Sequence, residues 1–433
     1  MTLRDGSPAA GNPSKPRFPP AFQWLFAADM VSLFGSLISR TALPFVAILF
    51  LNARPFEVAL LSVADIVAGF ASALLLGALV DRWPKQRVML VADVARALLL
   101  MAVPVGAWMG WLSVPLLLFI ALACGVFNVA FELAYSAWLP RLLQHDRLLA
   151  ANSRIAAGQA VVETASFSIG GWLVQWLGAP MAVLVDALSY LGSAMLIWRS
   201  RVAQDLQGDG RAAPPVEATP RPGALWTEAR EGLALLWRDP ILRTLAVVEF
   251  FGAGGQQMFG ALILVYLSRD LGFGPGVLGL IFAVGGISSL LGAVLAARLS
   301  ARWPTGPLMI GGLALMAAAL FLPPLATAAT WAGTALLIAQ QLIGDGAATV
   351  YQINDTVLRQ TRSRQETLAR VNAGIKFVGL AAMLLGALSG GFIAELWGAR
   401  AALFCAAGAV SLAAVLALGS NLRRFKGQAI AAD

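Results

Sequence analysis

The tripeptide Arg82-Trp83-Pro84 occurs twice in this chain of 433 residues, returning later as Arg302-Trp303-Pro304. Other matches have the same spacing, which we call the repeat offset: Gly170-Gly171 returns as Gly390-Gly391, Gly178-Ala179 as Gly398-Ala399, Asn152 as Asn372, and Asp29, within an apolar run, as Glu249. Matches that share one offset, one of them with Trp and Pro, indicate two copies of a unit of about 200 residues running in the same direction.

The composition is typical of a membrane protein. Hydrophobic residues make up 59% of the chain and charged residues 12%, with a mean hydropathy of +0.76, whereas soluble domains carry about 25% charged residues. A helix needs about 20 apolar residues to cross a hydrocarbon core of about 30 Å. Such runs predict twelve transmembrane helices, over 22–50, 57–81, 88–110, 113–138, 155–178, 181–198, 241–268, 277–301, 306–325, 330–353, 371–396 and 400–420.

The polar stretch 199–240 divides these spans into two sets of six. We therefore predict an all-α integral membrane protein with two parallel six-helix repeats, an architecture that places a transport site between the halves near the midplane. The expected units are an N-terminal tail (1–20), a first bundle (21–199), a linker with an amphipathic helix (200–240), a second bundle (241–421) and a C-terminal tail (422–433).

Basic residues are distributed unevenly along the chain. Of the 31 Lys and Arg residues, 25 lie at the termini, in the loops after even-numbered spans or at the adjoining span ends, and only Arg54, Arg269 and Arg400 lie on the other side. The positive-inside rule predicts an inner-membrane protein with both termini in the cytoplasm. The net charge of +8 reflects this asymmetry and attraction to anionic lipid, and no compact basic domain is present to bind nucleic acid.

The linker contains one segment with helical periodicity, residues 224–238 (ALWTEAREGLALLWR). Trp226, Ala229, Leu233 and Trp237 recur at helical spacing, opposite charged side chains. Two interpretations stay open: an amphipathic helix on the inner membrane surface, or an extension of the seventh span. Cys124 and Cys405 both lie in apolar spans, so we expect small core residues and no disulfide.

The loop between the second and third spans, Gly77 to Arg87 (GALVDRWPKQR), resembles the signature loop of the major facilitator superfamily, which has Gly, Leu, Asp-Arg and then basic residues. Asp29 to Pro44 (DMVSLFGSLISRTALP), and the segments Leu139 to Ser153 and Asp186 to Ser189, resemble the bacterial enterobactin exporters and macrolide efflux proteins. The resemblance covers the whole chain and implies a monomeric secondary transporter without a cofactor.

The resemblance also implies a conformational latch at the signature loop, formed by Gly77, Asp81, Arg82 and Arg87. A carboxylate there can face a helix N-terminus or pair with an Arg, whereas the basic residues can equally be inside anchors. The chain departs from the family pattern at two places. Ser166-Phe167 stand where the exporters have Gly-Pro before Gly-Gly, which weakens the antiporter assignment, and Ala301 replaces the loop Asp in the second copy, a degeneracy that is usual there.

Polar residues form stripes within the spans. Asp29, Ser32, Ser36 and Arg40 share one face of span one, and Glu249, Gly252, Gln256 and Gly260 repeat that spacing in span seven. A charge at the bilayer centre costs roughly 2.5–3.5 kcal/mol on insertion scales, so it needs a partner or an aqueous cavity. Paired stripes at equivalent positions therefore predict a shared central cavity. For any single residue, the alternative is a buried pair that sets helix register.

Burial favours the protonated form of a carboxyl group and a nearby Arg favours the ionised form, so a carboxylate exposed to both can exchange a proton. The proton-coupling candidates are Asp29, Glu132, Glu163 and Glu249. The substrate-cavity candidates are Arg40, Ser36, Asn128, Tyr135, Gln256, Asp345, Gln352 and Lys376. Asp65 and Asp93 are further candidates, although Asp93 and Arg96 are also expected to form a local ion pair. Asp186 is expected to cap the start of span six as a structural residue.

Together these features favour a proton-coupled exporter of small amphipathic molecules that works by alternating access. The alternatives are uptake, or movement of a lipid such as a lysophospholipid, and, from another class, a membrane receptor that does not transport. No Walker motif, nucleophile–base pair or Cys/His metal spacing is present, so we expect neither an enzyme nor a metal site. The expected partners are a small-molecule substrate, protons and membrane lipid.

Overall fold

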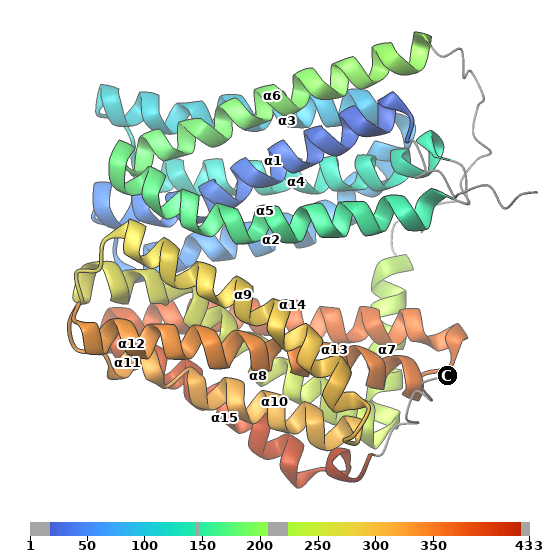
Figure 1. Cartoon of the computed structure of the whole chain (residues 1–433), viewed down its shortest axis with the longest axis vertical. Helices are drawn as coiled ribbons and strands as arrows, with labels where there is room; N and C mark the ends of the chain where they lie inside the picture. Colours follow the sequence, from blue (N-terminus) through green and yellow to red (C-terminus); the bar gives the residue numbers. More distant parts are fainter. Residues whose placement is uncertain (1–17, 144–146, 207–223, 426–433) are drawn as a thin grey trace, which may run out of the picture.

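The computed structural model describes residues 18–143, 147–206 and 224–425, and within these ranges the chain is helical without any strand. Long helices lie side by side in two groups, one from each half of the sequence, and Figure 1 shows the first half above the second. The all-α class and the division into two helical groups are confirmed. Nine helices of the described residues are long and apolar enough to cross a membrane.

The first group contains six long helices, and each covers one predicted span. They are α1 (Pro20–Phe45, continued by the π-helical turn η1, Val46–Phe50), α2 (Pro55–Arg82), α3 (Lys85–Met109), α4 (Val114–Leu142), α5 (Leu148–Leu177) and α6 (Ala179–Leu206).

The second group covers the other six predicted spans. Its elements are α8 (Pro240–Val265, continued by η3, Tyr266–Asp270), α9 (Pro275–Ser300), α10 (Thr305–Ala319) with α11 (Leu322–Leu325), α12 (Trp331–Gln340) with η4 (Gln341–Asp345) and α13 (Gly346–Arg362), α14 (Gln365–Trp397), and α15 (Ala399–Gly419) followed by η5 (Asn421–Arg424).

The repeat offset is visible in the backbone itself. Asn52 and Gly272 both have positive φ, at 50° and 79°, and Gly178 and Gly398 have φ of 85° and 84°. Left-handed backbone is accessible chiefly to Gly and, less often, Asn. The π-helical turns η1 and η3 are separated by the same offset. The repeat therefore preserves turn geometry as well as residue identity.

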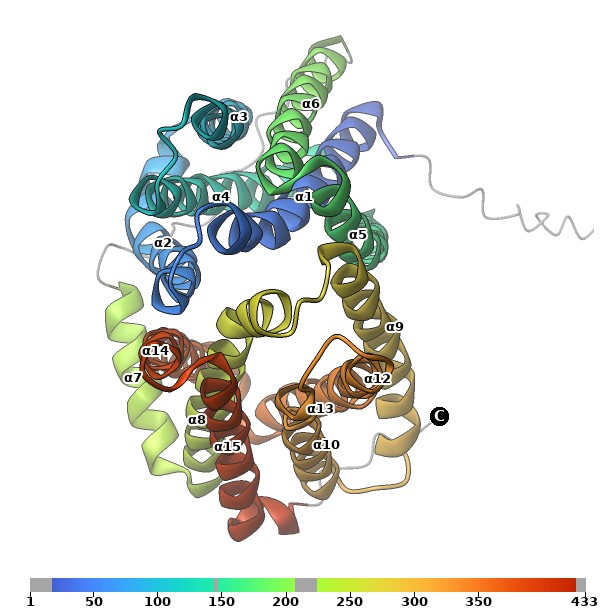
Figure 2. The same cartoon turned by 90° about the vertical axis from the view of Figure 1, so that its left-hand side faces the viewer.

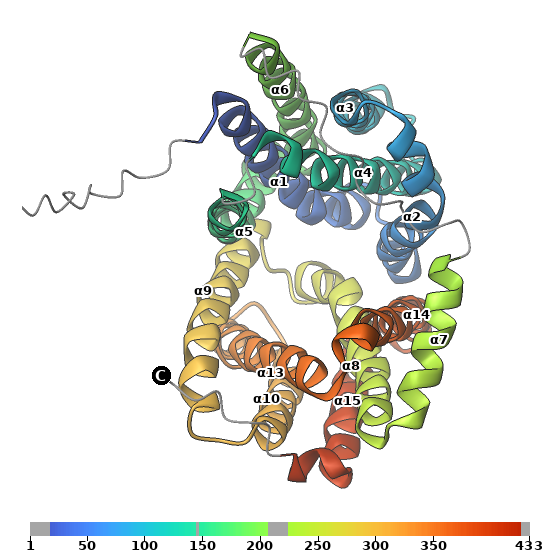
Figure 3. The same ribbon diagram turned by 90° about the vertical axis from the view of Figure 1, so that its right-hand side faces the viewer.

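Glycines bring the two halves together at the end of the bundle opposite the chain termini, which we call the far end. A Cβ on Gly171 of α5 would lie 2.9 Å from the Cα of Gly279 on α9, and one on Gly391 of α14 would lie 2.9 Å from the Cβ of Ala59 on α2. Both end views show α5 beside α9 and α2 beside α14 (Figures 2 and 3). Small residues at these positions permit this close approach of the helices.

The linker helix α7 (Ala224–Arg238) is a separate element. It ends at Arg238, and the carboxylate of the next residue, Asp239, caps α8 by accepting from the backbone N–H of Ile241 at 2.8 Å. Gly232 packs against Gly374 of α14, and Leu236 is buried. Figure 1 shows α7 running crosswise to the long helices. The seventh-span extension is therefore wrong, because Asp239-Pro240 breaks the helix. The surface location stays a prediction, and the side chain of Trp226 lies outside the described residues.

Candidate functional site

The polar stripe of α1 meets more than one environment. Asp29 is half-buried, and its Oδ2 has no hydrogen-bond partner among the described residues. Ser36 donates to the carbonyl of Ser32 at 2.7 Å and lies 2.8 Å from the hydroxyl of Tyr190 on α6. Arg40 is exposed. The stripe therefore has an inner part that packs on α6 and an exposed basic end.

Two candidates on α4 lie beside Asp29. Tyr135 and Glu132 both act on the Asp29 carboxylate electrostatically, and so does Asp93 of α3. The Tyr135 hydroxyl faces Asp29 but makes no well-aligned hydrogen bond to it. Glu132 is exposed, and so is Glu163 on α5. The structure thus groups three of the predicted residues, Asp29, Glu132 and Tyr135, and leaves Glu163 apart on another helix.

A buried ionic network lies between α1, α3, α4 and α6. Arg96 forms an ion pair with Asp93, as predicted, and also donates to the side-chain oxygen of Asn128. Its guanidinium carbon lies 4.0 Å from the ring centroid of Tyr190 and 4.8 Å from that of Phe131. Asn128 therefore accepts a hydrogen bond from the Arg96 guanidinium group, in addition to its predicted place in the cavity.

Asp186 belongs to the same network, and the prediction that it caps the start of span six is wrong. It lies seven residues inside α6, is fully buried, and accepts a hydrogen bond from Ser189 at 3.1 Å. A Cβ on Gly35 of α1 would overlap its carboxylate. Helix α6 begins at Ala179, directly after the Gly178 turn that ends α5, so Asp186 lies too far along α6 to cap its first turn.

In the second half, Glu249 is half-buried and fills the space beside a glycine of α14, since a Cβ on Gly379 would lie 2.7 Å from its Oε1. Asp355 and Arg359 of α13 act on it electrostatically and form an ion pair with each other. Sequence reasoning missed this pair, although acid and base four residues apart on one helix were a usable signal. Gln256 donates to the sulfur of Met316 at 3.3 Å.

Carboxylates occupy equivalent positions in the two halves, but opposite helices supply them. In the first half, Asp65 of α2 faces Gly125 of α4; in the second, Asp345 of η4 faces Gly285 of α9. The repeat offset relates Asp65 to Gly285 and Gly125 to Asp345, so acid and glycine are exchanged. Asp345 lies about 21 Å from Trp331 along the continuous helix formed by α12, η4 and α13, which is a depth near mid-membrane. The other cavity candidates of this half, Gln352 and Lys376, are exposed.

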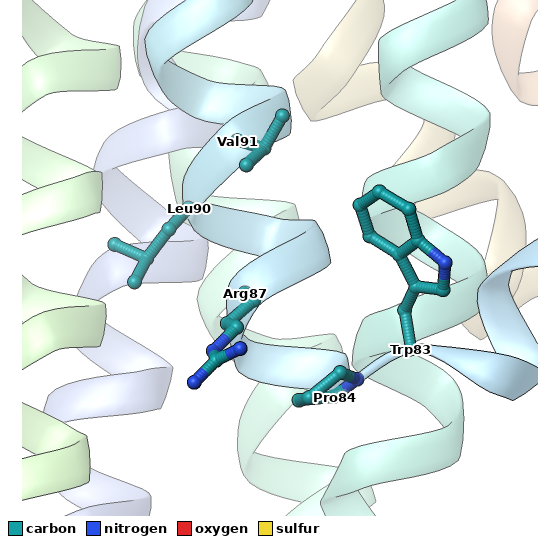
Figure 4. A pocket seen from close by; sticks show the side chains of 5 residues that line it. All are labelled: Trp83, Pro84, Arg87, Leu90 and Val91. Carbon is teal, nitrogen blue, oxygen red and sulfur yellow. The ribbon is translucent and has the colours of Figure 1, made fainter.

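The signature loop joins α2 to α3. Gly77 and Asp81 lie in the last two turns of α2, and the structure does not describe the surroundings of either residue, so the latch stays a prediction. Arg82 and Arg87 are exposed. Trp83, Pro84, Arg87, Leu90 and Val91 line an open surface depression, shown in Figure 4. An exposed Trp beside an Arg at a helix end fits the anchor interpretation of these basic residues.

Polar contacts close the far end between the halves. Arg269 donates to the carbonyls of Ile48 and Ala53 at 3.2 and 2.9 Å, and Arg54 pairs with Glu395 at 3.7 Å. Gln175 accepts from the backbone N–H of Gly276 at 2.8 Å. Glu395 stands at the repeat position of Gln175. Sequence reasoning used Arg54 and Arg269 only for topology, although the repeat of Gln175 as Glu395 was a signal for the partner of Arg54.

The described part of the chain contains no group of three or more His, Cys, Asp or Glu residues that could hold a metal ion. The site consists instead of carboxylates, amides and hydroxyls on facing helices, some of them paired with Arg96 or Arg359. Such an arrangement can bind and release protons or polar parts of a substrate, which are the tasks of an alternating-access cavity.

Comparison with known proteins adds three findings. A family model described as the Major Facilitator Superfamily matches residues 25–348 and 245–427. An uncharacterized MFS-type transporter of Sinorhizobium fredii is 28% identical over 410 residues, 93% of this chain and 94% of its own. The multidrug efflux pump Tap of Mycobacterium tuberculosis is 27% identical over 397 residues, 88% of each chain.

Solved structures have the same fold. A bacterial homologue of the iron transporter ferroportin in an inward-facing state superposes with a TM-score of 0.73, covering 92% of this chain and 98% of its own at 17% identity. At that identity the likeness concerns the fold alone.

Proposed function

This chain belongs to the major facilitator superfamily, a class of multi-pass membrane transporters, and on that basis we propose that it exports small amphipathic molecules, driven by proton influx. Similarity to a multidrug efflux pump over 88% of the chain is the observation that carries the export proposal. The substrate is expected to bind between the two halves near mid-membrane, where parallel-repeat transporters place their sites.

The polar residues available at that depth support an amphipathic substrate. Gln256 and Asp345 of the second half and Arg40 of the first lie near that depth, whereas Lys376 of the second half lies nearer the end of α14 that is opposite the far end. Most other side chains of these helices are apolar. A cavity with few polar groups on apolar walls fixes the orientation of a ligand while most of the contact stays hydrophobic.

Proton coupling is proposed from the carboxylates near the cavity. Asp29 lies beside Glu132 and Tyr135 and has a buried oxygen without a hydrogen-bond partner in the described part of the chain. Glu163 and Glu249 are further carriers in this proposal. Both termini are proposed to be cytoplasmic and the transporter monomeric, so that the far end closed in this structure is the external one and the cavity is accessible from the cytoplasm.

The test is proton-coupled transport in everted membrane vesicles. Vesicles energised to acidify their interior quench a pH-sensitive dye, and exported substrates release the quench by exchanging with protons. Cationic, neutral and anionic amphiphiles are compared for the intact chain, for Asp29→Asn, and for Glu57→Gln as the control. Glu57 lies in the first turn of α2 at the far end, where it accepts a hydrogen bond from the backbone N–H of Arg54, and glutamine can accept the same bond.

Release of the quench by some compounds, reduced in Asp29→Asn and retained in Glu57→Gln, is the expected result. If no compound acts on the intact chain while the purified protein still binds metabolites or lipids, the export proposal fails, and uptake or lipid movement is tested next.

A further inference from the structure

The buried network of the first half has no counterpart in the second. The repeat positions of Asp93, Arg96, Asp186 and Tyr190 hold Leu313, Met316, Ala406 and Val410. All four apolar residues are buried in the same way as the polar ones. The repeat therefore packs the same helices around an apolar core, so the fold itself does not require ions at these places.

The buried network lowers the free energy of unfolding compared with an apolar core of the same shape. Each buried ion loses its hydration, and replacing a buried ion pair by apolar residues is often neutral or stabilising. A structural role therefore explains the presence of the network poorly, since the second half packs the same helices with apolar residues at these positions. A group that must gain and lose charge during the transport cycle is a stronger explanation.

The charges in the network do not balance. Asp93 and Asp186 are both fully buried and share one guanidinium, that of Arg96. Arg96 pairs directly with Asp93, whereas Asp186 accepts from the hydroxyl of Ser189. One oxygen of each carboxylate, Oδ2, has no hydrogen-bond partner among the described residues. A bare buried carboxylate oxygen is costly, and a bound proton removes the charge.

Within the described ranges, the groups that face these two carboxylates include no second cation. Asp186 is faced by Ser39 on α1, Cys124 on α4 and Tyr190 on its own helix. Asp93 is faced by Ser193 of α6 and by Asp29 of α1. The hydroxyls of Ser39 and Ser193 make no well-aligned hydrogen bonds there, so they are available to donate to an ionised carboxylate or to accept from a protonated one.

We propose that the Asp93–Asp186 pair, held by Arg96, is the site that binds the coupling proton inside the N-terminal half. One proton binds to a carboxylate oxygen of the pair and is later released from it, so the network changes by one charge without any other reaction. This inference rests on the proposed function, which it deepens by separating the proton site from the substrate cavity.

The arrangement provides a route and a link to the cavity. Exposed Glu132 lies near Asp29, and Asp29 lies near Asp93, so carboxylates lead from the surface of α4 into the network. Gly35 of α1 rests directly on the Asp186 carboxylate. A change of charge there acts on α1, the helix that carries the stripe from Asp29 to Arg40.

The first readout needs no substrate. Purified protein in lipid is compared by infrared difference spectroscopy for the intact chain, Asp186→Asn, Asp93→Asn and the control Glu57→Gln, during a change of pH. We expect the band of a protonated carboxyl group to be lost in at least one Asp→Asn variant and retained in the control. A band unchanged in both variants overturns the proposal.

The second readout separates coupling from binding. In proteoliposomes, the same variants are tested for pH-driven accumulation of ethidium, a cationic amphiphile, and for its exchange without a gradient. We expect accumulation to be lost and exchange to persist. If the variants accumulate ethidium as the intact chain does, the proposed proton site is overturned while the proposed function stands. If the intact chain shows no pH-driven transport of any compound, the proposed function is refuted instead, and the infrared band decides whether the pair binds a proton.

A further variant guards against misfolding of the single substitutions. Asp93→Leu, Arg96→Met, Asp186→Ala and Tyr190→Val together give the first half the side chains that the second half already packs. We expect this variant to insert and exchange ethidium without pH-driven accumulation. If it accumulates ethidium like the intact chain, the network has no part in coupling.

Discussion

At the scale of single residues, the exchange of acid and glycine between the halves gives each half one carboxylate at the same depth. Asp65 is exposed beside Gly125, and Asp345 is half-buried beside Gly285. Neither carboxylate forms an ion pair among the contacts that the structure describes between these helices. In the proposed transport site, a carboxylate without a paired cation is free to attract a positively charged substrate.

Asp345→Asn is therefore predicted to weaken transport of cationic amphiphiles. The KM for a cationic dye should rise about tenfold or more, since a hydrogen bond to a charged group contributes about 1.5–3 kcal/mol. The measurement is concentration-dependent transport in vesicles, with a neutral substrate as the internal control. Equal losses for both substrates would show that Asp345 supports the helix and does not recognise charge.

The Asp355–Arg359 pair makes a prediction about stability. Asp355 is almost fully buried and Arg359 mostly so. Removing either partner leaves the other unpaired, so Asp355→Asn should lower the free energy of unfolding by about 1–3 kcal/mol. Thermal melts in detergent of Asp355→Asn, Arg359→Gln and the double variant measure the coupling. Losses that simply add in the double variant would contradict a direct interaction.

At the scale of helices, glycines set how closely α5 and α9 approach. A leucine at Gly171 cannot fit, because the backbone of Gly279 occupies the space its side chain needs. By contrast, a Cβ on Gly408 of α15 meets no atom within 4 Å. The two positions thus provide a crowded and an open site for the same substitution.

Gly171→Leu is predicted to keep the far end open and to abolish transport. A cysteine introduced at Gln175, in a background without Cys124 and Cys405, should react faster with a membrane-impermeant thiol reagent. Gly408→Leu is the matched control and should leave both labelling and transport unchanged. Unaltered labelling in Gly171→Leu would mean that the helices do not close at this contact.

At the scale of the whole molecule, the same contacts occur twice around the axis that relates the repeats. Gly171 against α9 corresponds to Gly391 against α2, and Gln175 corresponds to Glu395. Arg269 of η3 adds a contact between the halves that the repeat does not duplicate, because it donates to the carbonyls of Ile48 in η1 and of Ala53 just before α2, and Leu49 stands at its repeat position. These contacts hold one end of the transporter shut and must break when the opposite state forms.

Exchanging charges across the far end tests this closure. Glu395→Arg should place like charges together, loosen the closed end and reduce the rate of transport severalfold, since surface ion pairs contribute only about 0.2–1 kcal/mol. Adding Arg54→Glu should restore much of the loss. Closure is measured directly by cross-linking. One cysteine is introduced at Ala59 or Gly279 and a second on the helix that it faces, which is α14 for Ala59 and α5 for Gly279. No recovery in the double exchange would exclude the pair from the closing contact.

The sequence by itself determined the class of protein, because burial in a membrane forces long apolar helices that are readable as composition and run length. It also determined the two-copy architecture, since turns with left-handed backbone and close glycine contacts tolerate few residue types and therefore repeat as recognisable letters. The ion pair of Asp93 and Arg96 was predictable for a similar reason, as both lie on one helix three residues apart.

Only the tertiary structure decided which polar residues meet across helices. Ser36 and Tyr190 are 154 positions apart in the chain, and helical periodicity places each on a face without naming the helix opposite. For that reason only the structure showed that Asn128 accepts a hydrogen bond from Arg96 and that Asp186 is a buried member of the network. It also showed that Asp65 and Asp345 each face a glycine at corresponding places in the two halves. Which helix faces which is set by packing of the whole bundle, and that packing is not local in the sequence.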